Sequence, residues 1–300
     1  MGSERQFSIR GHAMQAPPLP AGLYLVSTPI GNLRDITIRA LEVLAACDLV
    51  ACEDTRTSEV LLRHYAISRP RISYNEHNAD RRGDEILATM AEGKSVALIS
   101  DAGTPLVSDP GQRLVNAVHQ AGLPVVPVPG ASAPLAALVG SGLGGTGFQF
   151  SGFLPNKAAA RKTALEKLAS HPLPVMAFES PSRLVSTLTA ICDVMGDDRT
   201  LVVARELTKM HETFHRGTAR QLLEEFSALE RVRGEIVIVI APMVAEELDD
   251  EAVADLLKEA LSRLKTKQAA AEVATQTGRS KGTLYKMALS LQTAEKDREG

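Results

Sequence analysis

The chain has 300 residues, of which 44% are hydrophobic and 23% are charged, and its formal net charge at pH 7 is −3. This composition predicts a soluble globular protein with room for two domains, and no apolar run is long enough to cross a bilayer. The small negative charge argues against a protein that coats nucleic acid through bulk charge, although a local basic patch remains compatible with it.

Residues 1–21 are predicted to form a disordered tail. The segment lacks the apolar run of a signal peptide and ends in Pro17-Pro18-Leu19-Pro20. The cysteines form no CxxC pair and match neither a disulfide framework nor a zinc site: Cys47, Cys52 and Cys192. These features predict a cytoplasmic protein without a bound metal.

Residues 22–134 are predicted to form an N-terminal α/β domain in which strands and helices alternate. The expected strands are residues 23–27, 49–53, 71–74, 95–101 and 125–128. The helices between them are expected to end at Ala46, Tyr65, Ala91 and Ala121. Such alternation is typical of parallel strands joined by crossover helices.

Three loops follow apolar strands of this domain, at residues 27–32, 100–105 and 129–133. Loops at the carboxyl ends of parallel strands hold ligands in open α/β sheets. Their Gly and Pro residues let the backbone turn tightly, and their Ser, Thr and Asp residues offer hydrogen bonds. One such loop is ordinary turn chemistry, but three at successive strand ends predict a ligand site.

Residues 135–243 are predicted to form a second α/β domain with a mixed sheet, joined to the first through residues 138–147. The expected strands are residues 148–154, 175–179, 201–206 and 235–241, and the expected helices are 157–169, 183–195 and 219–229. A further strand near residues 212–217 is expected to pair antiparallel with its neighbour.

Residues 244–300 are predicted to form a C-terminal helical segment. An acidic stretch at 246–251 begins a helix to Leu264, and residues 268–276 and 281–291 form two more helices around a turn at 277–280. The spacing is similar to a helix-turn-helix, in which these side chains would contact phosphates: Lys265, Lys267, Arg279, Lys281 and Lys286. A small helical bundle with a solvated basic face fits the pattern equally well.

Two motif matches are rejected on their structural context. The GLGGTG run at residues 142–147 follows a helix and precedes a strand, whereas a dinucleotide fingerprint follows a strand and opens a helix. The HETFH run at 211–215 is predicted to be a strand, so its histidines would lie about 13 Å apart, too far to share one zinc ion.

Several motifs occur in an order that is similar to a known family: TPIGNL (28–33), EDTR (53–56), NEHN (75–78), SDAGTP (100–105), SDPG (108–111), PGASA (129–133), FESPSR (178–183) and RELTK (205–209). Over about residues 23–291 the chain resembles the ribosomal RNA small subunit methyltransferase I branch of the tetrapyrrole methylase superfamily. The resemblance implies two α/β domains with S-adenosylmethionine in the cleft between them, and a homodimer. It also implies methylation of the ribose 2′-oxygen of a cytidine in the decoding region of 16S ribosomal RNA, either naked or in the assembled 30S subunit.

The resemblance implies cofactor contacts at matching positions in both domains: Pro29, Ala102, Gly103, Thr104, Ser132, Ala133, Glu179 and Ala204. The chain departs from the tetrapyrrole-modifying branch, whose first loop reads Gly-Pro-Gly-Asp and whose second carries Gly-Asp-Pro. Here Pro-Ile-Gly-Asn and Gly-Thr-Pro stand instead, which argues against a porphyrin-like substrate.

Methyl transfer is an in-line displacement that holds the acceptor oxygen about 3–3.5 Å from the methyl carbon. A positioned base removes the hydroxyl proton, and the candidates for it are Asp54, Glu53, Asp101, Glu206 and Lys209. The candidates for contact with RNA phosphates are Arg56, Arg183, Arg205, Lys281 and Lys286. Structural roles stay open, because Asp54 also fits a helix N-cap paired with Arg56, and Arg205 with Glu206 fits an ion pair at a domain interface.

Two alternative functions remain open. The first is an S-adenosylmethionine-dependent methyltransferase that acts on a tetrapyrrole or a protein side chain. The second is a nucleic-acid-binding regulator, in which the C-terminal helices read a DNA groove and the α/β part senses a ligand.

Overall fold

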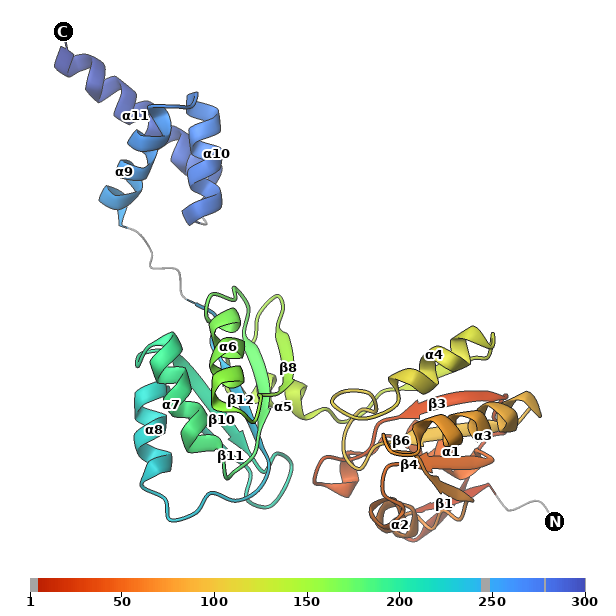
Figure 1. The fold of residues 1–300 in the computed structure, drawn as a ribbon. Coiled ribbons are helices and arrows are strands. Elements are labelled where there is room, and N and C mark those ends of the chain that lie inside the picture. Colours follow the sequence, from red (N-terminus) through yellow and green to blue (C-terminus); the bar gives the residue numbers. More distant parts are fainter. Residues whose placement is uncertain (1–4, 244–248, 278, 300) are drawn as a thin grey trace. The chain divides into compact units, whose positions relative to one another are not determined.

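The computed structural model describes residues 5–243, 249–277 and 279–299 (Figure 1). Contacts within the chain divide it into two units, Met1–Pro242 and Met243–Gly300. Within the described residues, none of the helices combines the length and the apolar character that a bilayer crossing requires.

The first sheet of unit 1 has five parallel strands in the order β5-β4-β6-β3-β7. Their bounds are β3 (Gly22–Val26), β4 (Leu49–Cys52), β5 (Arg71–Ser73), β6 (Ser95–Ile99) and β7 (Val125–Val128). The predicted parallel sheet is therefore confirmed. Pro127 lies in β7 at the edge of the sheet, where a residue without an N–H group is tolerated.

Helices cover both faces of this sheet, as Figure 1 shows. The short helix η1 (Leu33–Asp35) precedes α1 (Ile38–Ala46) and α2 (Thr55–His64), which pack on one face. The other face carries α3 (Ala79–Ala91) and α4 (Gln112–Gln120). The strands bury apolar side chains on both faces, which explains why their sequences are continuous apolar runs instead of alternating ones.

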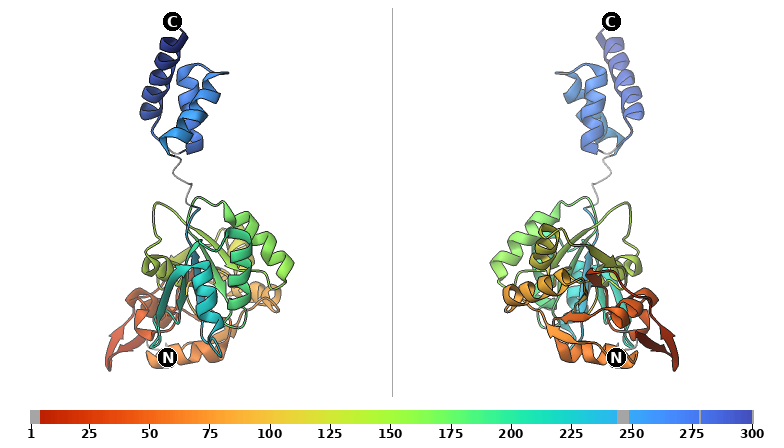
Figure 2. Two further views of the ribbon diagram at one scale, coloured as in Figure 1. Left: turned by 90° about the vertical axis from the view of Figure 1, so that its left-hand side faces the viewer. Right: turned by 90° about the vertical axis from the view of Figure 1, so that its right-hand side faces the viewer.

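The prediction of a disordered tail is wrong for residues 6–15. They form a hairpin of β1 (Gln6–Ile9) and β2 (His12–Gln15), the dark red strands in Figure 2. Arg10 and Gly11 form its turn with positive φ angles of 52° and 81°. Phe7 is 1% exposed and packs into the core beneath α1. A single buried aromatic residue anchors the hairpin, and strands this short leave too little alternation for a sequence prediction. Residues 1–4 of the predicted tail lie outside the described residues.

The second sheet of unit 1 is mixed and has the order β11-β10-β12-β9-β8. Strands β8 (Gln149–Phe153) and β9 (Val175–Glu179) are parallel. The strands β10 (Thr200–Arg205), β11 (Thr213–Thr218) and β12 (Ile236–Ile240) are joined by antiparallel pairings. The predicted mixed sheet and the predicted antiparallel strand near residues 212–217 are both confirmed.

One face of the second sheet carries α6 (Ala158–Ala169), α7 (Leu184–Met195) and α8 (Ala219–Ser227). The opposite face carries α5 (Ala133–Ser141), so the first four residues of the linker predicted at 138–147 are helical instead. Leu138 is 8% exposed and packs in the core of this face, and Gly142 ends the helix with a φ of 67°. Ile30, from the loop after β3, belongs to the same apolar cluster and joins the two halves of unit 1.

The described residues of unit 2 form three helices, α9 (Asp250–Leu261), α10 (Thr266–Thr277) and α11 (Lys281–Glu299). They pack around a small apolar core that includes Leu257, Val273 and Leu284. The three predicted helices are confirmed, and α11 extends beyond the predicted end at 291. Residues 246–248 of the predicted acidic helix start lie outside the described residues.

All three cysteines are free and buried, and burial raises the pKa of the Cys47 thiol to about 12. His215 lies in β11, and its Nδ1 is 2.6 Å from Oε1 of Glu225. The rejected zinc motif therefore lies partly in a strand, as expected from its sequence.

Candidate active site

The three predicted ligand loops converge at the carboxyl ends of β3, β6 and β7. The backbone N–H of Thr28 donates to the carbonyl of Gly103 at 2.8 Å, and the N–H of Gly103 donates back to Thr28 at 3.0 Å. The hydroxyl of Thr104 donates to the carbonyl of Ala131 at 3.2 Å. These bonds tie the three loops into one rigid edge.

A first cavity of about 470 Å³ lies between this edge and the second sheet. The first half of unit 1 contributes loop residues that include Ala102, Gly103 and Thr104. The second half contributes residues at the ends of β8, β9 and β12: Phe153, Phe178, Glu179, Ile236 and Val237. The rings of Phe153 and Phe178 are in tilted contact, with centroids 5.2 Å apart and planes at 56°.

A second cavity of about 630 Å³ adjoins the first. Its wall includes Pro29, Gly31, Asp54, Arg56 and Lys209. The residues that line both cavities are Ile30, Asp101, Ala102 and Glu235. The two cavities therefore meet at these four residues.

Six of the eight predicted cofactor contacts line the first cavity: Ala102, Gly103, Thr104, Ser132, Ala133 and Glu179. Pro29 lines the second cavity instead. Ala204 lines neither, because it is 0% exposed in the core beneath α5. Val237 of β12 pairs with Ala204 in the sheet and lines the first cavity. The neighbouring strand β12, and not β10, therefore forms this part of the cavity wall.

Asp54 is the N-cap of α2, and its carboxylate accepts hydrogen bonds from the backbone N–H of Arg56 at 2.8 Å and from the Arg56 guanidinium at 3.0 Å. The side-chain bond from Arg56 lowers the pKa of Asp54. Asp101 Oδ1 accepts the backbone N–H of Asp54 at 3.1 Å. Loss of solvation raises the pKa of Asp101, against the opposing effect of that bond.

Glu53 and Asp109 stand close to Asp101 in the first cavity. Burial raises the pKa of Glu53, and the nearby charges of Asp101 and Asp109 raise it further. Burial also raises the pKa of Asp109. The sequence prediction included Glu53 but missed Asp109, whose only signal was its place in the SDPG motif.

Lys209 forms ion pairs with Glu206 at 2.8 Å and with Glu235 at 3.1 Å. Burial acts to lower the pKa of Lys209, but the hydrogen bonds to Glu206 and Glu235 outweigh it, so the pKa is raised. The same bond from Lys209 lowers the pKa of Glu206. Lys209 is thus a fixed cation at the second cavity, and Glu206 holds it there.

The loop 206–209 is pressed against the loop after β3. A Cβ on Gly31 would lie 2.5 Å from Cγ of Lys209 and 2.8 Å from Oγ1 of Thr208, so only glycine allows this approach. The backbone N–H of Asn32 donates to Oγ1 of Thr208 at 3.1 Å. Glu206 and Thr208 have positive φ angles of 54° and 64°, a strain that is common at functional sites.

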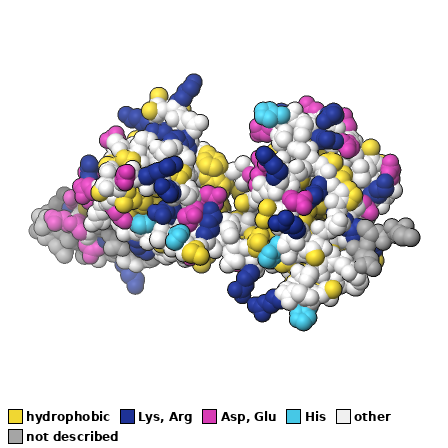
Figure 3. Space-filling model, turned by 90° about the horizontal axis from the view of Figure 1, so that it is seen from below, with side chains coloured by type: hydrophobic (Ala, Val, Ile, Leu, Met, Phe, Trp, Pro, Cys, Tyr) yellow, Lys and Arg dark blue, Asp and Glu magenta, His cyan; other side chains and the backbone are white. Residues whose placement is uncertain are grey.

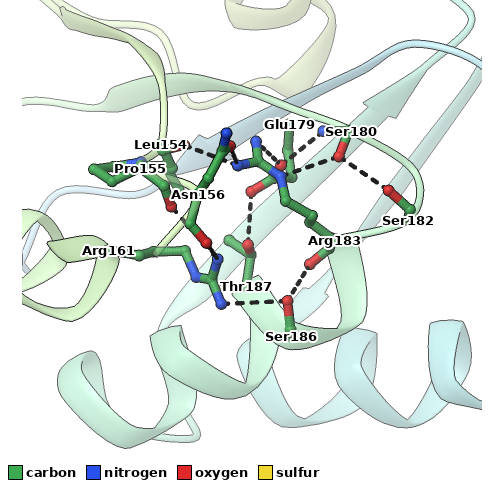
Figure 4. A network of polar contacts seen from close by, with 10 residues as sticks. All are labelled: Leu154, Pro155, Asn156, Arg161, Glu179, Ser180, Ser182, Arg183, Ser186 and Thr187. Carbon is green, nitrogen blue, oxygen red and sulfur yellow. Dashed lines mark hydrogen bonds and ion pairs between the residues drawn. The ribbon is translucent and has the colours of Figure 1, made fainter. Parts of the chain in front are cut away.

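Arg183 and Glu179 form the centre of a polar network at the start of α7 (Figure 4). Their ion pair is 2.5 Å long, the Glu179 side chain is 0% exposed, and Thr187 donates a hydrogen bond to its carboxylate at 2.6 Å. The Arg183 guanidinium also donates to the Leu154 carbonyl at 3.2 Å and to Asn156. Arg183 therefore holds the loop after β8, and its contact with RNA phosphates stays a prediction.

The other predicted phosphate contacts are Arg56, Arg205, Lys281 and Lys286. Arg56 is 90% exposed at the second cavity. Arg205 does not pair with Glu206, and its Nε is buried without a hydrogen-bond partner among the described residues. Lys281 and Lys286 are exposed on α11 of unit 2. Figure 3 shows basic and acidic side chains interspersed on the face drawn, without one continuous basic surface there.

The described residues contain no group of three or more His, Cys, Asp or Glu side chains suited to hold a metal ion. The charged side chains that line the two cavities are carboxylates, Arg56 and Lys209.

Two family models match the chain. The model of Tetrapyrrole (Corrin/Porphyrin) Methylases matches residues 22–223, and the model of the RsmI C-terminal HTH domain matches residues 246–292. The chain is 48% identical over 285 residues to the ribosomal RNA small subunit methyltransferase I of Mesorhizobium japonicum, covering 95% of this chain and 97% of the relative. It is 43% identical to the protein of the same name from Escherichia coli O157:H7, covering 90% and 95% of the two chains.

Solved structures share the fold of unit 1 at low sequence identity. The cobalamin biosynthetic enzyme cobalt precorrin-4 methyltransferase superposes with a TM-score of 0.58 at 18% identity, covering 73% of this chain and 94% of that one. Uroporphyrin-III C-methyltransferase from Thermus thermophilus, complexed with S-adenosylhomocysteine, superposes with a TM-score of 0.52 at 18% identity, covering 73% and 96%. The fold, the family model over 22–223 and the relatives agree that this chain belongs to the tetrapyrrole methylase family, among the ribosomal RNA small subunit methyltransferase I proteins.

Proposed function

We propose that this protein uses S-adenosylmethionine to methylate the ribose 2′-oxygen of a cytidine in the decoding region of 16S ribosomal RNA. The names of its relatives support ribosomal RNA as the substrate class. The observation that carries the proposal is the pair of adjoining cavities with Asp101 in the wall between them. Such an arrangement suits a reaction in which a donor and an acceptor meet at one point.

The first cavity fits the donor. It offers apolar walls for a purine nucleoside at Phe178, Leu207 and Val237, and backbone turns at 102–104 for close hydrogen bonding. When bound, S-adenosylmethionine supplies a methyl group on a positively charged sulfur. The residues that we assign to hold it are those of the predicted set that line this cavity: Ala102, Gly103, Thr104, Ser132, Ala133 and Glu179.

The second cavity suits the acceptor nucleotide. Lys209 is held as a cation by two carboxylates, and Arg56 is exposed at the same cavity. Both side chains donate hydrogen bonds to phosphate oxygens, Lys209 as a point charge and Arg56 through its planar fork. Contacts from Arg183, Arg205, Lys281 and Lys286 to other phosphates of the RNA belong to the same proposal.

Asp101 is our choice of general base among the five predicted candidates. It lines both cavities, and its raised pKa makes it a better proton acceptor than an ordinary carboxylate. Asp54 caps α2 and is bound to Arg56, Glu206 is bound to Lys209, and Lys209 is protonated. Glu53 lines only the first cavity, away from the acceptor.

We further propose a homodimer that acts in the cytoplasm, on naked ribosomal RNA or on the 30S subunit. An exposed apolar patch on α5 and β11 supports the dimer: Leu135 is 47% exposed, Val139 is 81% exposed and Phe214 is 37% exposed. Gly140 of α5 lies against the Phe214 ring, so the patch is continuous between the two elements. Apolar patches of this kind mark association surfaces.

The test is methyl transfer from labelled S-adenosylmethionine to undermethylated 30S subunits and to naked 16S ribosomal RNA. Alkaline hydrolysis leaves an uncleaved dinucleotide wherever a ribose 2′-oxygen is methylated, so we expect the label in one such dinucleotide with a 5′ cytidine.

Label on a base or on ribosomal protein would contradict the proposal. So would a protein that transfers label to a tetrapyrrole but not to RNA, the outcome that the alternative function predicts.

A further inference from the structure

The charged side chains that line the first cavity are all acidic. Five of its lining residues are carboxylates, Glu53, Asp101, Asp109, Glu179 and Glu235, and none of the described lining residues is a lysine, arginine or histidine. A cavity of about 470 Å³ with this lining favours a ligand with positive charge over a neutral ligand of the same shape.

Two of the five carboxylates are already compensated by cations outside the cavity. Glu179 pairs with Arg183 at 2.5 Å, and Glu235 pairs with Lys209 at 3.1 Å. Glu53, Asp101 and Asp109 form no ion pair within the described residues. The uncompensated negative charge is therefore concentrated at the end of the cavity formed by the first half of unit 1.

In the absence of a ligand, the negative charges of these three carboxylates repel one another. Desolvation and like charge act in the same direction on Glu53, whose surroundings contain Asp54, Glu76, Asp101 and Asp109 as charged groups. A positive ligand that enters the cavity relieves this repulsion, whereas a neutral ligand leaves it in place.

We propose that Glu53 and Asp109, together with Asp101, are specificity determinants that make this cavity bind the sulfonium donor in preference to its thioether product. The inference rests on the proposed cofactor. It does not depend on which acceptor is methylated, because it concerns the donor cavity alone.

The preference for a positively charged ligand favours release of the product, because the reaction removes the positive charge. The acceptor oxygen forms a bond to the methyl carbon, the carbon–sulfur bond breaks with its electron pair left on sulfur, and the hydroxyl proton passes to Asp101. The sulfur loses its positive charge in this step, so the attraction to Glu53 and Asp109 disappears once the methyl group has left. The product is then released more readily than the donor.

The test is isothermal titration of the full chain with three ligands: S-adenosylmethionine, S-adenosylhomocysteine and sinefungin, in which a carbon bearing an amine replaces the sulfonium. In Glu53→Gln and in Asp109→Asn, we expect the two cationic ligands to bind about tenfold more weakly, and the neutral product to change less than twofold. Glu166→Gln removes the same charge from an exposed position on α6 and serves as the matched control.

Binding of the neutral product also reports that each variant is folded. Equal weakening of all three ligands would overturn the proposal, because it would mean that the carboxylates shape the cavity without selecting charge. Failure of the wild-type chain to bind any of the three would instead contradict the proposed cofactor.

A second measurement needs no variant. The ratio of the affinities for donor and product isolates the sulfonium charge, because the two ligands share every other ionisable group. We expect this ratio to fall as the pH is lowered through the raised pKa values of Glu53, Asp101 and Asp109. A ratio that stays constant over that range would also overturn the proposal.

Discussion

Asp101 is the residue to which we assign the proton transfer. It lines both the first and the second cavity, and one of its oxygens is held by the backbone N–H of Asp54. That bond fixes the carboxylate in place, and in the proposed reaction its other oxygen accepts the proton. Asp54, Glu206 and Lys209 are occupied by their own partners and support the site through position.

Asp101→Asn should lower the turnover number at saturating donor by about 10² to 10⁴-fold, the usual contribution of a general base. The amide preserves the shape and accepts the Asp54 hydrogen bond, but it does not take a proton. Single-turnover methyl transfer to 30S subunits measures the effect. The control is Asp84→Asn, at an exposed site on α3. If the Asp101→Asn enzyme kept the wild-type turnover number, Asp101 would not be the base.

The pH profile gives the same assignment a second readout. Because the base acts as the carboxylate, turnover should fall as the pH is lowered through the raised pKa of Asp101, above the ordinary value for aspartate. Asp101→Asn should lose this acidic limb. A limb that persists unchanged in the variant would place the titrating base elsewhere.

Six of the eight cofactor contacts expected from the sequence line the first cavity, because its loops follow strands in a recognisable order. Pro29 lies at the second cavity and Ala204 lies in the core, and the role of each of the eight residues stays a prediction. The sequence did not indicate Asp109 or Val237 as lining residues, because their approach depends on how a loop and a neighbouring strand fold back in space. Arg183 was a candidate for contact with phosphates, and the partner of its ion pair, Glu179, lies within the same run of sequence.

At the scale of elements, the start of α7 and the loop after β8 are held together by Arg183. Its partner Glu179 is fully buried, so removal of the guanidinium leaves an uncompensated buried charge. Arg183→Ala should lower the free energy of unfolding by about 3–5 kcal/mol, measured by urea denaturation.

Thr187→Val, which removes a single hydrogen bond to the same carboxylate, is the milder comparison. Unchanged stability of Arg183→Ala together with weaker RNA binding would contradict this structural role and favour the phosphate contact predicted from the sequence.

The contact between the loop after β3 and the loop 206–209 depends on Gly31. Gly31→Ala would force a methyl group against Lys209 and Thr208, and overpacking of this kind costs about 1–3 kcal/mol. Displacement of Lys209 should also raise the KM for 30S subunits. Gly144→Ala, where a methyl group meets open space, should change neither quantity, and a Gly31→Ala variant equal to wild type would show that the contact has no role in placing Lys209.

The elements themselves were largely predictable from the sequence, because the strands are continuous apolar runs and most of the helices that cover the two sheets are amphipathic. The order of strands in space was not, since nothing in the sequence pairs β3 with both β6 and β7. The hairpin β1–β2 was missed because its strands are short and Phe7 is the one fully buried side chain within them. The predicted linker at 138–147 overlaps the last four residues of α5.

At the scale of the whole molecule, the proposed homodimer predicts that the patch on α5 and β11 is covered in solution. Val139→Asp places a charge at a site that is 81% exposed in one chain, so the fold should tolerate it and the association should not. Light scattering after gel filtration should show a dimer for the wild-type chain and a monomer for this variant. The control variant Ala159→Asp, at an exposed position of α6, should remain a dimer. If the Val139→Asp chain were also a dimer, this surface would not be the interface.

The burial of all three thiols makes the protein suitable for site-selective labelling. Cys47, Cys52 and Cys192 are shielded from solvent, and the thiol of Cys47 stays protonated at neutral pH. A maleimide dye added to the native protein should therefore react with a cysteine introduced at the surface and leave the natural ones untouched. A pair of such dyes, one on each half of unit 1, would report by energy transfer whether the halves approach each other when the donor binds.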